Sequence, residues 1–256
     1  MLQRVHQCSA ETTNNLSSVP ADDLMHMAVA GQIFVTCQTA LDAGGSSPIT
    51  RIARNARPIR RDTHYPDGDV YDQETASQYY FHSHRHADEE HGHFHTFLRA
   101  RAIPASIRPA PYAGRARRPT GRDAVCHLIA VSTDRHGHPT GLFTTNRWVT
   151  GESFYAANDV IALLPLFRIA RQTPCQTTNA WLTALIQLFA PQICTLLHDR
   201  DARIAARQAE HPKCDPFEDR NLEVTSSMAI NPELQIADIA DELQRRRLSN
   251  PSSSHK

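Results

Sequence analysis

The stretch YYFHSHRHADEEHGHFHTFLR, residues 79–99, decides the expected fold, because histidines alternate with other residues along both of its halves. Alternation is the period of a β-strand, in which residues i, i+2 and i+4 lie on one face of the sheet. We therefore expect two antiparallel arms, Tyr79–His86 and His91–Arg99, with a turn at Ala87–Glu90. This turn lacks the glycine that two-residue hairpin turns prefer.

The register of this hairpin decides whether its two rows of histidines can act together. Pairing about the middle of the turn places His84 opposite His93 and His82 opposite His95, with both rows on one face. Directly opposed residues have Cβ atoms ~5 Å apart, which is close enough for two imidazoles to bind one metal ion. A shift by one residue would separate the rows onto opposite faces, so the prediction depends on the register.

Strands in the middle of the chain, with helices before and after them, predict an α+β fold. The sheet is expected to be antiparallel, to come from the central hairpins and to pack against N- and C-terminal helices. A second hairpin is expected at Val125–Ser132 and Gly141–Asn146, and Asp62–Gln73 is expected to be a loop. The remaining expected elements are a short strand at 222–230 and helices over 21–43, 160–171, 180–208 and 232–248.

The same pattern predicts a single domain over residues 19–248. A polar leader at 1–18 and a disordered tail at 249–256 flank it. Within the domain, residues 100–122 contain prolines and arginines but no acidic residue. This composition is typical of a mobile loop, because it cannot bury enough apolar surface to offset the entropy of ordering.

Composition limits the class of protein. The chain has 256 residues, with 27 Lys and Arg against 27 Asp and Glu, so bulk charge predicts no nucleic-acid partner. Its six cysteines are scattered and form no C-x-x-C motif, which favours reduced thiols in the cytoplasm. Neither a signal peptide nor an apolar run of the ~20 residues that span a membrane is recognised, so no membrane partner is expected.

The histidines indicate a transition-metal site, because neutral imidazole binds Zn, Fe, Cu and Ni. His127, in the apolar stretch AVCHLIA, is expected to be buried, either as a ligand or as a hydrogen-bonded core residue. The predicted metal ligands are His82, His84, Glu90, His93, His95 and His127, and zinc or iron is the expected ion. Alternatively, the alternating histidines form only a solvated strand face.

A second group of candidate residues follows the second hairpin in TTNRWVTGE, residues 144–152. Arg147 can bind a carboxylate or phosphate through two hydrogen bonds, and Glu152 can act as a general base. Both are therefore predicted catalytic residues. The alternative is that Arg147 and Glu152 pair with each other as scaffold.

Four strings resemble a family of bacterial proteins known only as a domain of unknown function. They are HYPDGDVYD (64–72), SQYYFHSHRH (77–86), EHGHFHTFLR (90–99) and TTNRWVTGE (144–152). The resemblance covers roughly residues 60–210 and implies no activity. It implies only that the four strings belong to one site.

Together these features predict a metal-dependent enzyme that acts on a small anionic molecule. The alternatives are a metal-binding or metal-sensing module without catalysis, and a structural protein with incidental histidines. A small-molecule ligand is the expected partner of the enzyme. The sequence leaves the oligomeric state open.

Overall fold

The computed structural model describes residues 16–53, 59–83, 91–112 and 114–249, and all strands in this part of the chain belong to one sheet. The six strands lie in chain order, and each runs antiparallel to its neighbours. They are β1 (Tyr65–Tyr71), β2 (Ser77–His82), β3 (Gly92–Arg99), β4 (Val125–Thr133), β5 (Pro139–Thr145) and β6 (Val224–Ala229). Antiparallel neighbours can be joined by short turns, but a long loop separates β3 from β4 and a long helical segment precedes β6.

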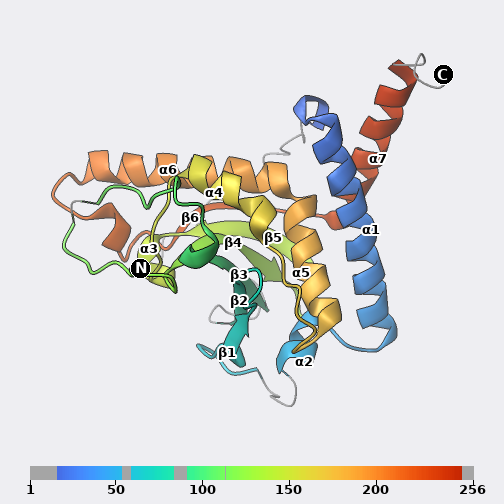
Figure 1. Cartoon of the computed structure of the whole chain (residues 1–256), viewed down its shortest axis with the longest axis horizontal. Coiled ribbons are helices and arrows are strands. Elements are labelled where there is room, and N and C mark those ends of the chain that lie inside the picture. Colours follow the sequence, from blue (N-terminus) through green and yellow to red (C-terminus); the bar gives the residue numbers. More distant parts are fainter. Residues whose placement is uncertain (1–15, 54–58, 84–90, 113, 250–256) are drawn as a thin grey trace.

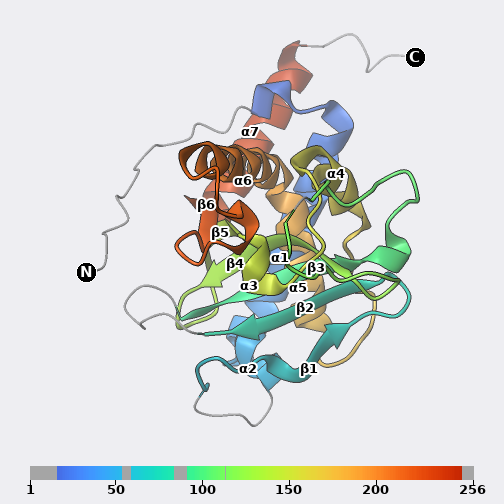
Figure 2. The ribbon, with the colours of Figure 1, turned by 90° about the vertical axis from the view of Figure 1, so that its left-hand side faces the viewer.

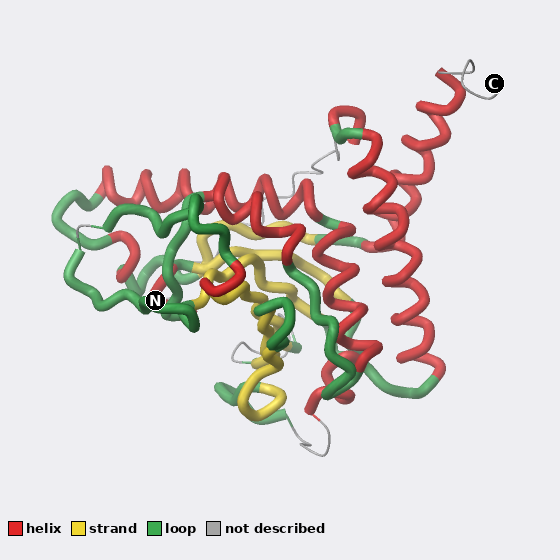
Figure 3. The backbone as a smooth tube through the Cα atoms, in the orientation of Figure 1, coloured by secondary structure: helices red, strands yellow, loops and turns green. Residues whose placement is uncertain are grey.

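Helices precede and follow the strands. They are α1 (Ala21–Ala43), α2 (Pro48–Ala53), α3 (Arg147–Thr150), α4 (Ala157–Leu163), α5 (Gln176–Leu188), α6 (Ala190–Glu210) and α7 (Pro232–Ser249). Short 3-10 helices lie at Leu16–Ser18, Ala100–Ala102, Leu164–Leu166 and Pro216–Glu218. α5 and α6 lie on one side of the sheet, α1 packs on α5, and α7 packs beside α1 (Figure 1 and Figure 3). The predicted α+β fold is confirmed.

The helices cover the face of the sheet that carries large apolar side chains. The ring of Trp181 in α5 lies 5.6 Å from that of Phe94 in β3, and Phe81 in β2 lies 5.1 Å from Phe94. All three side chains are buried. Aromatic pairs at such separations add about 0.5–1.5 kcal/mol beyond the burial of their area. The hydroxyl of Tyr79 donates a hydrogen bond to Asn179 in α5 at 2.7 Å, so the buried phenol is satisfied.

The register of the β2–β3 pair differs from the predicted register by two residues. Phe81 pairs with Phe94, and therefore His82 pairs with His93 and not with His95. The predicted register would have placed Phe81 opposite a threonine and lost the aromatic pair from the core. A shift of two residues leaves every side chain on its face, because the side-chain period is two. His82, His93 and His95 therefore still share one face.

The prediction of a loop over Asp62–Gln73 is wrong, because β1 occupies most of this range. The prediction rested on Pro66 and Gly68, because proline and glycine are common in loops. An edge strand tolerates them, since one of its sides has no partner strand to hydrogen-bond. The pairing of β1 with β2 is irregular in its middle, where Asp69 has a φ of 58°.

The helical prediction over 180–208 is also corrected, because α5 and α6 are separate helices bent by 71° relative to each other. Pro191 stands in the first turn of α6. There its missing N–H needs no partner, but it cannot continue the preceding helix. Likewise α4 ends at Leu163, before a 3-10 turn that contains Pro165. The strands predicted at 125–132, 141–146 and 222–230 agree with β4, β5 and β6 to within about two residues.

α1 is long and apolar enough to cross a membrane by length and composition, and 39% of its most apolar window is buried. In the described part of the chain, α5 and α6 pass the same test only if they are counted as one bent span. Helices in the core of soluble proteins also meet this criterion, and Phe34 of α1 packs on Trp181 of α5 at 5.9 Å. The test is therefore weak evidence for a membrane span.

The arginine-rich loop at 100–122 makes specific contacts with the segment before α4. The N–H of Ala110 donates to the carbonyl of Phe154 at 2.9 Å, and the hydroxyl of Ser153 donates to the carbonyl of Pro119 at 2.8 Å. These bonds attach two points of the loop to the domain. Mobility of the remaining loop stays a prediction.

Gly92 begins β3 at a place where a larger residue does not fit. A Cβ there would lie 2.3 Å from Cζ of Phe81 and 2.7 Å from the carbonyl oxygen of His82. We expect Gly92→Ala to lower the free energy of unfolding by about 1–3 kcal/mol, the usual cost of overpacking, as measured by urea unfolding. Gly44→Ala is the control, since its Cβ would meet nothing closer than 3.4 Å. Equal losses in the two variants would contradict the prediction.

Candidate metal centre

The face of the sheet opposite Phe81 and Phe94 carries most of the candidate ligands. Side chains alternate along β2 and β3, so the residues between the core positions point to this second face. We call it the histidine face, and it consists of Tyr80, His82, His93, His95, Phe97, His127 and Phe143. His93 and His95 are only 1% and 0% exposed. The alternative of a solvated strand face is therefore wrong for these two residues.

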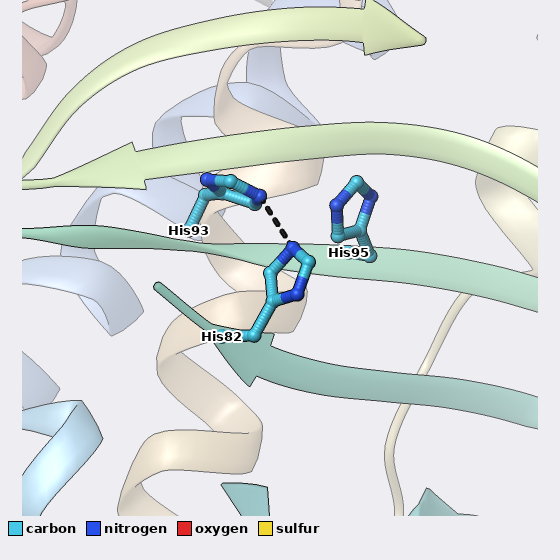
Figure 4. A group of neighbouring side chains, drawn as sticks. All are labelled: His82, His93 and His95. Atoms are coloured by element: carbon cyan, nitrogen blue, oxygen red, sulfur yellow. Dashed lines mark hydrogen bonds between the residues drawn. The ribbon is translucent and has the colours of Figure 1, made fainter. Parts of the chain in front are cut away.

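His82, His93 and His95 bring three imidazoles together above β2 and β3 (Figure 4). One nitrogen of each ring lies within 4.8 Å of the others, and the Nε2 atoms of His82 and His93 are 2.7 Å apart. The ring centroids are separated by 4.5, 4.8 and 5.1 Å. Imidazoles on one tetrahedral zinc, with Zn–N bonds of ~2.1 Å, have centroids roughly 5 Å apart. The triad could therefore hold one ion, and in this structure Nε2 of His82 and Nε2 of His93 share a hydrogen bond.

His127 reaches the histidine face through an irregularity in β4. The pairing of β3 with β4 shifts after Thr96, so that His127 lies opposite Phe97. A β-bulge of this kind redirects a side chain. Nε2 of His127 lies 3.0 Å from Nδ1 of His95. Burial, with a smaller effect of the Arg200 cation, lowers the pKa of His127 to about 3, so His127 is neutral and shares one hydrogen bond with His95.

That hydrogen bond supports an orienting role for His127, and its predicted place among the metal ligands stays a prediction. When the Nδ1–H of a histidine is held by an acceptor, its Nε2 is the atom left to bind a metal. His95 meets this condition in the tautomer whose Nδ1 carries the proton and donates it to Nε2 of His127. Neither His127 nor His64, the histidine that precedes β1, is among the described residues whose nitrogens converge within 4.8 Å.

The side chain of Glu152 is hydrogen-bonded to the backbone of β4 at His127. Its Oε2 accepts a hydrogen bond from the N–H of His127 at 2.6 Å, whereas its Oε1 is buried without a hydrogen-bond partner among the described residues. Burial raises the pKa of Glu152 to about 7, although the Arg200 cation acts to lower it. The carboxyl group can therefore gain or lose a proton near neutral pH, as a general acid or base must.

Arg147 is buried at the start of α3, and its guanidinium donates hydrogen bonds to two other groups of the protein. Its Nε donates to the carboxylate of Glu218 at 2.6 Å, and a terminal nitrogen donates to the backbone carbonyl of Glu152 at 3.3 Å. Asn146 caps the same short helix by accepting the N–H of Arg147 at 2.8 Å. These contacts support the scaffold alternative, with Glu218 as the ion-pair partner in place of the Glu152 carboxylate.

Two of the predicted ligands, His84 and Glu90, lie outside the described residues, so their ligand roles stay predictions. The predicted pairing of His84 with His93 is wrong, because His93 pairs with His82. His136 and His138, which are not among the predicted ligands, lie exposed in the β4–β5 turn.

The sequence pattern missed His64, which precedes β1. Its ring stacks on that of Tyr80 with centroids 3.7 Å apart, and its Nδ1 lies 3.1 Å from Oδ1 of Asp69. The interpretation of 62–73 as a loop concealed it, because a lone histidine in a loop has no periodicity to mark it. The only signal is its position at the head of HYPDGDVYD, one of the four strings that the resemblance groups into one site.

Comparison with known proteins gives a family and no activity. A family model described as a domain of unknown function (DUF6969) matches residues 28–230. This range contains all six strands and the histidine triad. Neither the curated proteins nor the solved structures contain a match.

Arg147 provides a test of its scaffold role. We expect Arg147→Ala to lower the free energy of unfolding by about 1–3 kcal/mol, because it leaves the partly buried Glu218 without its charged donor. Arg168→Ala is the matched control, since it breaks an ion pair with Glu74 whose side chains are 58% and 75% exposed, and such pairs contribute ~1 kcal/mol or less. Urea unfolding measures both. An Arg147 variant as stable as the control would contradict the scaffold role.

Glu152 predicts a pH dependence of stability. Its folded-state pKa of about 7 lies above the ordinary value of 4.5, so the protonated carboxyl stabilises the fold. That contribution is complete below pH 4.5 and is lost as the pH rises through 7. The loss reaches up to about 3 kcal/mol at ~1.4 kcal/mol per pKa unit.

Glu152→Gln removes this titration. The free energy of unfolding of the variant relative to wild type should therefore rise between pH 4.5 and 7.5, measured by urea unfolding with a chelator present. Glu74→Gln, at an exposed carboxylate, is the control. Parallel pH profiles for wild type and Glu152→Gln would show that burial of this carboxyl costs nothing.

Proposed function

Because this chain belongs to the DUF6969 family, a domain of unknown function, we propose its function from the site: it binds one transition-metal ion through His82, His93 and His95. One observation carries the proposal. Three imidazoles from two adjacent strands converge to within 4.8 Å of one another on a buried face.

The donor set favours zinc or iron. All three ligands are neutral nitrogens, which suit Zn, Fe, Cu and Ni better than Ca or Mg, whose preferred ligands are oxygens. The surroundings are apolar, with the ring of Phe143 5.0 Å from that of His93. Burial favours neutral imidazole, and only the neutral form coordinates a metal. The buried carboxylate of Glu152 would offset part of the charge that a cation brings.

A metal-dependent enzyme acting on a small molecule is the second candidate. Glu152 favours it, since a buried carboxyl with a pKa near 7 and one unpartnered oxygen can transfer protons. Three protein ligands also leave one position for water or substrate, as in catalytic zinc sites. The contacts of Arg147 remove the main reason to expect an anionic substrate, because its guanidinium is bound to Glu218.

We also propose that the protein works in a reducing compartment such as the cytoplasm. The five cysteines of the described residues are all free thiols. Disulfides persist mainly in oxidising compartments.

Metal binding is tested with protein purified without a histidine tag and titrated with zinc. We expect about one equivalent to bind and to raise the melting temperature, because a ligand that binds only the folded state stabilises it. His93→Ala and His95→Ala should each lower the affinity by more than the ~10–100-fold that the loss of an outer-shell partner costs.

His138→Ala is the control, as it removes an imidazole from the exposed β4–β5 turn. It should bind zinc like wild type. Stoichiometric zinc in both triad variants would place the site elsewhere, and wild-type protein that binds no zinc, iron, copper or nickel would end the proposal.

A further inference from the structure

His64 lies beside His82, at one side of the triad, although it precedes a different strand. It immediately precedes β1, which lies beside β2 at one edge of the sheet (Figure 2). Its ring stacks on that of Tyr80 at an interplanar angle of 9°. It lies edge-on to the ring of His82, at an interplanar angle of 81° and with 5.5 Å between the two centroids. Tyr80 in turn contacts His82 and His95, at 5.4 and 5.2 Å. One tyrosine ring therefore touches three of the histidines.

A chain of polar contacts holds the His64 ring in place. Its Nδ1 bonds to Oδ1 of Asp69 at 3.1 Å, and Oδ2 of Asp69 accepts from Gln78 at 2.8 Å. Gln78 accepts from Nε of Arg99 at 2.9 Å. Asp69 is in the left-handed region, with φ 58°, a conformation that costs free energy in a non-glycine residue. Asp69 therefore contacts His64 from a backbone conformation that lowers the stability of the fold.

We propose that His64 is the fourth ligand of the metal site and binds through Nε2 while Asp69 accepts its Nδ1–H. The inference rests on the proposed function and completes the donor set. The 5.5 Å between His64 and His82 is close to the roughly 5 Å expected for imidazoles on one zinc ion. A carboxylate on the far nitrogen is the usual outer partner of a metal-bound histidine.

His127 is the competing fourth ligand, and its contacts argue against it. Its Nε2 is engaged with Nδ1 of His95 at 3.0 Å. His64 has the opposite arrangement, because Nδ1 is the engaged nitrogen and no other hydrogen bond joins its ring to the described residues. His127 therefore supports His95 as Asp69 supports His64.

A fourth histidine changes what the site can do. Four imidazoles fill a tetrahedral zinc ion and leave no position for substrate, which favours a protein that holds its metal over an enzyme. His64 has a side chain 45% exposed, whereas His93 and His95 are buried. His64 is therefore the most solvent-accessible member of the proposed ligand set.

Cobalt(II) substitution tests the proposal, because its visible absorption reports the coordination number. Wild-type protein should bind one Co²⁺ with the intense bands of a tetrahedral site, and azide should leave them unchanged. In His64→Ala, water should replace the imidazole. The bands should weaken and shift with azide, and the affinity should fall by roughly 100-fold or more, beyond the ~10–100-fold of an outer-shell loss.

Asp69→Asn keeps the residue's shape, and asparagine tolerates the left-handed conformation, so this variant should fold. It should lower the affinity by about 10–100-fold while keeping the tetrahedral bands. His138→Ala should match wild type in every measurement. Circular dichroism at the working temperature confirms that each variant is folded.

The outcomes separate the two levels of the proposal. Wild-type protein that binds no Co²⁺ or Zn²⁺ would overturn the metal site itself. Wild-type binding with a His64→Ala spectrum and affinity equal to wild type would overturn only the fourth ligand. Wild-type bands that already respond to azide would indicate an open position, and they would favour the enzyme candidate.

Discussion

The packing of Phe81 against Phe94 beneath Trp181 is the interaction on which the rest of the structure depends. It lies on the face of the sheet that α5 covers, and it sets the register of β2 against β3. Because the next residue along each strand points to the other face, this register also places His82 opposite His93. A contact in the apolar core therefore decides the geometry of polar groups on the far side of the sheet.

β3 is buried on both faces, and this burial removes the imidazoles of His93 and His95 from water. Exposed imidazoles titrate near pH 6.5 and compete with water for any ligand. The buried imidazoles lie instead in an apolar layer beside Phe97 and Phe143, where desolvation penalises the charged form of a side chain. The low pKa of His127 is one result of this environment. The raised pKa of Glu152 has the same physical cause acting on a group of opposite charge.

Two departures from regular β-structure supply the contacts around the triad. The bulge in β4 turns His127 toward His95, and the left-handed residue Asp69 in β1 directs its carboxylate toward His64. In a regular strand, strict alternation fixes the face to which each side chain points. Without these two irregularities, the side chains of His127 and Asp69 would point in other directions. Arg147 makes no such contact with a histidine of the triad among the interactions described above. Its ion pair with Glu218 instead joins the start of α3 to the segment before β6.

The alternation of histidines determined by itself that His82, His93 and His95 share one face, and the order of strands and helices determined the α+β class. Registers that differ by two residues satisfy that alternation equally, so only the core contact of Phe81 could decide which histidines are opposite each other. His64 carries no periodic signal. Its place beside the triad follows from the pairing of an edge strand with β2, and such a long-range contact exists only after the chain has folded.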